Sequence, residues 1–289
     1  MSRLRQHFAL FEHAGQAWLA DGAPSMGAAL AFYSAFSLAP LLIIASAVAG
    51  LVFGASTARS AVVTQFKDLI GPIGAEAVQR LLNATANIGT GVAASAVGVA
   101  LLLIGASSVV IELQNDLNRI WRVPKRDRSG YTALIRARLL AFGLILGFGF
   151  LLLVSLVINV GLAAMVQHSR VFAQQALLLH ALNLLVSVAA YSVLFAMLFK
   201  FLPNVRLAWH DIWRGAFVTA VLFSLGQLGI GFYLGRSATT SAYAAAASLL
   251  VLLLWLYYAA QIFLFGAEFT RVYAQRHRAR AQAKPRTAR

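Results

Sequence analysis

Residues that could carry enzyme chemistry are few and widely spaced in this sequence. The chain has no cysteine, which removes disulfides, thiolate metal sites and cysteine nucleophiles. It contains no HExxH motif, no GxSxG elbow and no Walker A loop. Its scattered histidines include no pair at metal-ligand spacing; they are His7, His13, His168, His180, His210 and His277. The sequence therefore predicts a protein that is not an enzyme and that uses no metal or cofactor.

Polar side chains within apolar runs are a second group that could do chemistry. They are Tyr33, Ser34, Ser37, Asn159, Asn183, Ser187, Gln227 and Gln261. Such groups either line a substrate path or form interhelical hydrogen bonds, each contributing about 0.6 kcal/mol on average. The interiors of the apolar runs contain no Asp, Glu, Lys or Arg, whereas ion-coupled pumps usually keep an ionisable group at membrane depth. We therefore expect an amphiphilic or neutral substrate rather than a coupled ion.

A basic segment follows the second apolar run. It extends from Arg119 to Arg138 and includes Trp121, Arg122, Lys125 and Arg126. Contact with anionic lipid contributes about 1 kcal/mol per basic residue near a membrane surface. Binding of RNA would require stacking aromatic residues or a folded module, and neither is evident here. We expect this segment to form a cytoplasmic rim that contacts lipid headgroups, with no nucleic acid as a partner.

The elements that position these residues are long apolar runs. The chain is 60% hydrophobic and 11% charged, against about 25% charged residues in soluble domains. Its clearest run, from Met26 to Phe53, is longer than the roughly 20 residues that cross a bilayer, and Pro40 near its centre predicts a kink. The six predicted transmembrane helices cover about residues 26–53, 92–111, 139–166, 176–199, 215–235 and 242–267.

The remaining segments complete the prediction of an all-α integral membrane protein. We expect residues 1–25 to form an amphipathic interfacial helix. We expect residues 269–289 to form a basic, disordered tail. Residues 55–90, the first external loop, predict two short amphipathic helices interrupted at Gly71 and Pro72. With six spans, nineteen Lys and Arg residues fall on one side and five on the other. The positive-inside rule then places both termini in the cytoplasm.

Four motifs, in order along most of the chain, resemble the YihY/virulence factor BrkB family of bacterial inner-membrane proteins. They are GAALAFYSAFSLAP (27–40), LNRIWRV (117–123), LPNVRLAWHDIWRGA (202–216) and LLWLYYAAQIFLFGAEF (253–269). The resemblance implies six spans with both termini inside. It also implies functional candidates at the motif positions Tyr33, Ser37, Pro40, Asn118, Trp121, Pro203, Asn204, Trp255, Tyr257 and Glu268.

The family's members have been labelled ribonuclease BN, and others are associated with virulence or with lipid handling at the inner membrane. This sequence contains no nuclease site that would support the first label. We expect a transporter or flippase-like exporter of an amphiphilic or lipidic substrate in the cell envelope. The alternative is a membrane scaffold that recruits envelope partners through its basic cytoplasmic loops. Anionic membrane lipids are the expected partners, with a homo-oligomer or envelope proteins as the protein partners.

The candidate residues fall into two groups under the first hypothesis. Substrate-path candidates are Tyr33, Ser34, Ser37, Pro40, Asn159, Asn183, Gln227, Trp255, Tyr257, Gln261 and Glu268. Candidates for the headgroup-binding cytoplasmic rim are Asn118, Arg119, Trp121, Arg122, Lys125, Arg126, Pro203 and Asn204. Glu268 has a simpler alternative role, because Arg271 lies three residues further on and can pair with it along a helix.

Overall fold

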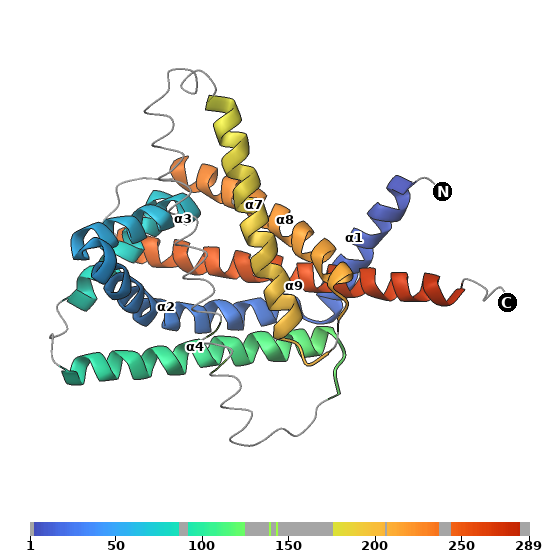
Figure 1. The fold of residues 1–289 in the computed structure, drawn as a ribbon, viewed down its shortest axis with the longest axis horizontal. Coiled ribbons are helices and arrows are strands. Elements are labelled where there is room, and N and C mark those ends of the chain that lie inside the picture. The colour runs from blue at the N-terminus through green and yellow to red at the C-terminus, as the bar shows by residue number, and fades with distance from the viewer. Residues whose placement is uncertain are drawn as a thin grey trace.

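The computed structural model describes residues 3–86, 92–124, 139, 143, 176–205, 207–236 and 244–283. Within these ranges every regular element is an α-helix, which confirms the all-α prediction for this part of the chain (Figure 1). The helices are α1 (Arg3–Ala20), α2 (Ala23–Phe53), α3 (Ala55–Ala86), α4 (Val92–Ile120), α7 (Ala176–Phe201), α8 (Trp209–Arg236) and α9 (Ala244–Ala283).

Three of the described helices are long and apolar enough to cross a membrane. The apolar stretches are Leu184–Phe201 in α7, Trp209–Gly229 in α8 and Leu249–His277 in α9. The predicted first and second spans fall within α2 and α4, which have 31 and 29 residues. The predicted third span, residues 139–166, lies outside the described residues except at 139 and 143. The total of six spans therefore stays a prediction.

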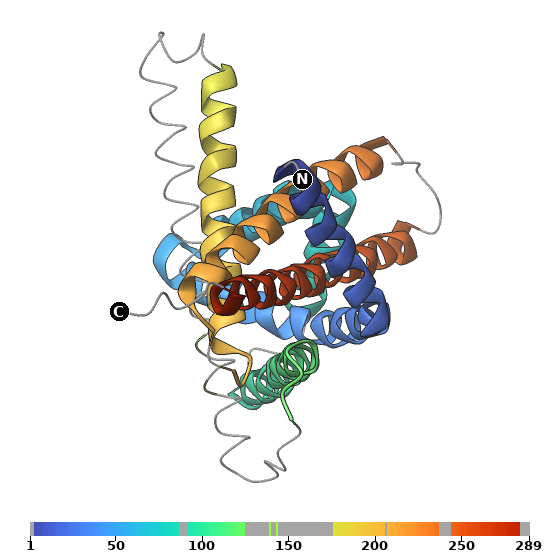
Figure 2. The ribbon, with the colours of Figure 1, turned by 90° about the vertical axis from the view of Figure 1, so that its right-hand side faces the viewer.

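Helices α2, α4 and α9 lie side by side and form the body of a bundle (Figure 1). Helix α9 runs antiparallel to α2, since Gln261 reaches Ala23 at the start of α2 whereas Leu252 packs in a cluster with Leu38. Helix α8 packs on α9, and α7 packs on α8 while crossing the bundle (Figures 1 and 2). The α1–α2 corner and the last turns of α9 lie at one end of the bundle, and α3 lies at the other.

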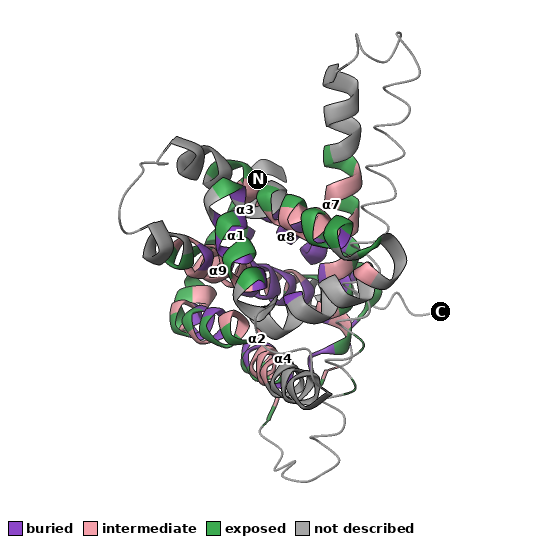
Figure 3. Ribbon diagram, turned by 90° about the vertical axis from the view of Figure 1, so that its left-hand side faces the viewer, coloured by how far each residue is buried: buried purple, intermediate pink, exposed green. Residues whose placement is uncertain are grey.

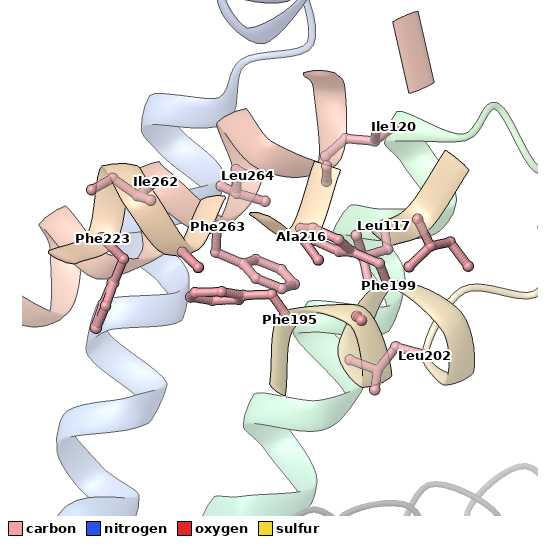
Figure 4. Packing of buried hydrophobic residues seen from close by; sticks show 14 of the residues in the cluster. Leu117, Ile120, Phe195, Phe199, Leu202, Ala216, Phe223, Ile262, Phe263 and Leu264 are labelled. Carbon is pink, nitrogen blue, oxygen red and sulfur yellow. The ribbon is translucent and has the colours of Figure 1, made fainter. Parts of the chain in front are cut away.

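Aromatic side chains from α7, α8 and α9 fill the centre of the bundle (Figure 4). The rings of Phe195 and Phe199 lie with their centroids 6.3 and 5.2 Å from that of Phe263. Phe223 meets Phe195 edge-on at 5.7 Å. Such tilted and edge-on arrangements are favourable because they bring ring edges against ring faces. Buried residues consequently face the middle of the bundle, and exposed residues face outward (Figure 3).

Helices α8 and α9 approach closely through two reciprocal glycine–threonine contacts. Gly215 of α8 faces Thr270 of α9, and Thr219 of α8 faces Gly266 of α9. Both threonines are fully buried, and each hydroxyl donates a 2.7 Å hydrogen bond to a carbonyl of its own helix. In lipid, helix association depends on packing rather than on the hydrophobic effect, so small residues that let backbones approach are stabilising. This contact fixes the α8–α9 hairpin.

Helix α3 consists of two helical segments that meet at Gly71. This residue has φ 77° and ψ 179°, a conformation that glycine adopts readily, and Pro72 begins the second segment. The interruption agrees with the one predicted from the sequence. The second segment is buried in a cluster shared with α2 and α9, whose members are Leu38, Leu42, Ala77, Val78, Leu82 and Leu252. Packing against the bundle therefore holds α3 in place.

Helix α9 continues to Ala283, whereas its composition predicts a disordered tail from residue 269. Phe269 and Ala274 are buried in this continuation. Phe269 is covered because α1 packs across this end of the bundle, with Leu10 and Ala14 in one cluster with Phe269. The difference from the prediction has a tertiary cause, since a basic composition does not reveal that another helix will cover the segment.

The close α8–α9 contact predicts different effects on stability for two Gly→Ala substitutions, one inside the contact and one outside it. In Gly266→Ala, the new Cβ would lie 2.9 Å from the Cβ of Thr219, a separation that forces the helices apart. We expect destabilisation by about 1–3 kcal/mol, as for other overpacked sites. Gly229→Ala on α8 meets no atom within 4 Å and should be neutral or stabilising. Thermal unfolding of both variants in detergent tests this, and equal changes in Tm would contradict the proposed packing role.

Candidate functional site

Four charged side chains from three parts of the chain meet at the α1–α2 corner. We call Asp21, Arg122, Glu268 and Arg271 the corner cluster. The Arg122 Nη2 atom donates to Asp21 Oδ1 at 2.7 Å, joining the end of α4 to the corner. Arg271 donates to Glu268 Oε2 through Nε at 3.0 Å and pairs with it through Nη2 at 2.7 Å. The same Nη2 lies 3.7 Å from Asp21 Oδ2, so one guanidinium serves both acids.

The four side chains of the corner cluster differ sharply in exposure. Those of Glu268, Asp21 and Arg271 are 0%, 5% and 10% exposed, whereas that of Arg122 is 64% exposed. Asp21 Oδ2 and Glu268 Oε1 are buried and accept no hydrogen bond from the described residues. A buried ion pair is stabilising only relative to its broken form, because removing one partner leaves an unpaired charge. The cluster thus combines a buried core with one arginine that faces outward.

Arg122 occupies an unusual backbone conformation. Its φ is 54°, in the left-handed region, which costs a non-glycine residue about 1–2 kcal/mol. The conformation closes the C-terminus of α4, since the Val123 N–H donates to the carbonyl of Asn118 at 2.9 Å, as in a Schellman motif. An arginine stands where glycine is usual. Its side chain reaches Asp21 from this position, so the strained residue carries an interaction that glycine could not make.

The described residues of the predicted rim lie at the same end of the bundle. The Asn204 backbone N–H donates to Asn118 Oδ1 at 2.8 Å, and Gln114 Nε2 donates to the Leu202 carbonyl at 2.8 Å. These bonds tie the end of α4 to the segment after α7. The positions of the other candidates are as follows: Pro203 is buried, Trp121 is half-buried, Arg119 and Arg122 are exposed, and Lys125 and Arg126 lie outside the described residues.

One of the predicted substrate-path hydroxyl residues on α2, Ser37, lies close to α4. The Ser37 hydroxyl donates to the carbonyl of Ser34 at 3.0 Å. The Ser37 Cβ lies 3.1 Å from the position that a Cβ on Gly105 of α4 would occupy. Tyr33 is exposed, beside the exposed Phe32. The α2–α4 contact therefore uses Ser37 as a small residue that permits close approach. A role for Tyr33, Ser34 and Ser37 in a substrate path stays a prediction.

Two predicted path amides join helices instead of standing together. Gln227 of α8 donates to the Tyr191 hydroxyl of α7 at 3.2 Å. Gln261 of α9 donates to the carbonyls at the start of α2, at 3.4 Å to Ala23 and 3.3 Å to Pro24. Trp255 and Tyr257 are half-buried on α9. Pro40 lies within α2 and Asn183 within α7, but their side chains are not among those described. Asn159 lies outside the described residues.

Asp21 belongs to the site, although it is not among the candidates identified from the sequence. The available signal was its chemistry, because an acid between an amphipathic helix and an apolar run must either reach water or find a cation. Gly22 is the N-cap of α2 and has φ 73°, so the helix begins without a side-chain cap and leaves the Asp21 carboxylate for Arg122 and Arg271. Which cations it would meet could not be read from sequence spacing.

A further buried acid, Asp116, lies near the C-terminal end of α4, beyond the predicted second span. Asp116 is buried, and its Oδ2 accepts no hydrogen bond from the described residues. Burial raises the pKa of Asp116 from its ordinary value of 3.8 to about 7; the negative charge of Glu112 adds to the rise, and Arg119 opposes it. Near neutral pH this carboxyl therefore exchanges a proton that ordinary aspartates have already lost.

Comparison with known proteins gives a consistent family relationship. The family described as Virulence factor BrkB matches residues 14–289. A UPF0761 membrane protein of Ralstonia nicotianae is 29% identical over 92% of this chain and 57% of its own length. Another, of Saccharophagus degradans, is 30% identical over 91% of this chain and 59% of its own length. The chain thus spans somewhat under three fifths of these relatives. No solved structure matches it.

The corner cluster predicts unequal effects for two arginine substitutions. Arg271→Gln leaves Asp21 and Glu268 without their buried cation, and we expect a loss of about 3–5 kcal/mol of stability. Arg80→Gln, the matched control, breaks the exposed Arg80–Glu76 pair of 2.5 Å and should cost about 0.5 kcal/mol or less. Thermal unfolding in detergent measures both. Similar Tm values for the two variants would show that the corner cluster contributes no more than a surface pair.

The raised pKa of Asp116 predicts that the stability of the folded protein depends on pH. Because its pKa is higher in the folded protein than in the unfolded chain, its contribution is complete below about pH 4 and is lost as pH rises through about 7. Asp116→Asn should therefore remove part of the fall in Tm between pH 5 and 8. Glu12→Gln, at an exposed position on α1, is the control and should leave that fall unchanged. A parallel pH profile for Asp116→Asn and the unsubstituted protein would refute the assignment.

Proposed function

Because this chain belongs to the virulence factor BrkB family, whose relatives are named membrane proteins, we propose that it is a multi-pass protein of the bacterial inner membrane that binds and moves an amphiphilic, lipid-like substrate. The proposal includes cytoplasmic termini, six spans and no enzymatic step. Apolar helices are its necessary background, since α7, α8 and α9 each contain a stretch that could cross a membrane.

The observation that carries the proposal is the exposed arginine of the corner cluster. Arg122 is held by the buried Asp21 but keeps most of its side chain accessible. A guanidinium has five N–H donors, so pairing one nitrogen with Asp21 leaves donors for a second anion. Phosphate is well suited to this geometry because arginine binds it through parallel hydrogen bonds. A lipid headgroup at this position would have its phosphate beside Arg122.

The apolar part of such a substrate would lie against the outward faces of the helices. On α2, Phe32 and Phe36 are exposed one helical turn apart, with Tyr33 beside them. These residues follow the corner along the same helix, so a headgroup at Arg122 and an acyl chain along α2 would occupy consecutive levels of the bundle. The hydroxyls of Tyr33, Ser34 and Ser37 lie in the same stretch of α2 as Phe32 and Phe36 and would contact the substrate beyond its headgroup.

The distribution of basic residues supports a cytoplasmic headgroup site. Helix α1 and the basic end of α9 lie at the same end of the bundle as the corner cluster (Figure 1). The excess of Lys and Arg on this side favours the cytoplasm, where anionic lipid headgroups also attract basic segments. In this orientation Arg119 and Arg122 stand at the level of the inner-leaflet phosphates.

The proposal predicts selective lipid retention by the purified protein. Native mass spectrometry after release from mild detergent should find one anionic lipid class enriched over its membrane proportion. Neutralising the rim with Arg122→Gln and Arg126→Gln should reduce this retention, because each arginine near the surface contributes about 1 kcal/mol. The control variant, Lys67→Gln with Arg80→Gln, removes the same charge from exposed positions of α3 and should keep the lipid.

Retention of bulk lipid in membrane proportions, unchanged in both variants, would contradict the lipid-handling proposal. The scaffold role predicted from the sequence would then be the better account, and its partners should be sought with the basic rim intact. If a lipid class is retained selectively, that class becomes the substrate for transport assays in vesicles.

A further inference from the structure

A half-open cavity lies between the two segments of α3. Helix α3 lies at the opposite end of the bundle from the α1–α2 corner (Figure 1). Its volume is about 290 Å³. Five polar side chains line it: Arg59, Ser60, Thr64, Gln79 and Asn83. Val63 and Leu82 provide its apolar part. Neither the family relationship nor the lipid site proposed above assigns a role to these residues.

The lining predicts the charge of a ligand. Arg59 is the only charged residue among the described residues that line the cavity. Among the described residues, Arg59 makes no ion pair and is exposed, so its guanidinium is available to a ligand. The hydroxyls of Ser60 and Thr64 are one turn apart on the same segment and can also donate. An arginine with neighbouring hydroxyl donors is a favourable environment for a phosphate group.

The facing wall predicts what else the ligand carries. Gln79 and Asn83 are four residues apart on the second segment, so both amides lie on one face of that helix. Each amide offers two N–H donors and one acceptor oxygen, a combination that pairs with hydroxyl groups. A ligand spanning the cavity would thus present phosphate to the Arg59 wall and hydroxyls to the amide wall.

The two segments that line the cavity both pack against the bundle. Leu82 is buried in the cluster with Leu38, Leu42 and Leu252, which fixes the second segment against α2 and α9. Val62, Val63 and Phe66 of the first segment pack against the same cluster. Both segments that line the cavity are therefore held against the bundle.

We propose that the α3 cavity binds a headgroup-sized phosphate ester that carries free hydroxyl groups, with Arg59 on the phosphate and Gln79 and Asn83 on the hydroxyls. The volume lies at the low end for small-molecule sites and admits such a headgroup but not a whole lipid. The same chemistry occurs in glycerophospholipid headgroups and in free phosphorylated polyols. This site is separate from Arg122, so it goes beyond the lipid site proposed at the corner cluster.

Binding of two probes to the full chain in phosphatidylcholine nanodiscs tests the proposal. The probes are free glycerol 3-phosphate and phosphatidylglycerol added to the nanodisc, with glycerol as the neutral control. We expect slower hydrogen–deuterium exchange in residues 59–64 and 79–83 with a phosphate probe and no change with glycerol. Protection by the lipid alone identifies a membrane-borne headgroup as the ligand, and protection by free glycerol 3-phosphate identifies a soluble one.

Substitutions separate the cavity from general charge effects. Arg59→Gln should weaken binding about tenfold or more, because it removes charge-assisted hydrogen bonds to phosphate. Arg80→Gln removes the same charge from an arginine of α3 that pairs with Glu76 outside the lining, and should leave binding nearly unchanged. Asn83→Ala provides a second test if Arg59→Gln unfolds. No protection by either probe, or equal loss in the Arg59 and Arg80 variants, would overturn the proposal without affecting the lipid retention expected at Arg122.

Discussion

The ion pair between Arg271 and Glu268 places a positive and a negative charge in the interior of the bundle, where each is costly unless the other is present. Asp21 adds a second buried acid to the same guanidinium, and Arg122 completes the charge balance from outside. This requirement for local neutralisation joins the α1–α2 corner, the end of α4 and the last part of α9. Helix α1 then covers α9 at this end, which explains why α9 continues past residue 269.

Close packing supplies the second constraint. Between helices in lipid there is little hydrophobic driving force. Helices therefore associate where their contact area is large and where the polar groups at the contact already have hydrogen-bond partners. The reciprocal pairs of Gly215 with Thr270 and Gly266 with Thr219 meet both conditions, because each threonine hydroxyl is bonded within its own helix. Charge fixes one end of α9, and this small-residue contact fixes its side against α8.

The two ends of the bundle consequently have different chemistry. One end has strongly basic residues around a buried acid pair, and its exposed Arg122 suits a headgroup phosphate. The other end has the α3 cavity, where a single arginine faces hydroxyls and amides. Apolar helix faces connect these ends, which is the arrangement that a protein handling amphiphiles needs. The BrkB family relationship is consistent with this arrangement in a membrane, and the substrate itself is a matter for the lipid measurements.

The sequence by itself determined the helical class, the membrane character, the family and the helix break at Gly71, because apolar runs, small residues and motifs are local properties of the chain. It also indicated the Glu268–Arg271 pair, since both residues lie on one helix. Tertiary structure alone decided that Asp21 shares Arg271 and that α9 continues under α1. These contacts join residues more than a hundred positions apart, and burial creates the energetic need for them only after the helices have packed.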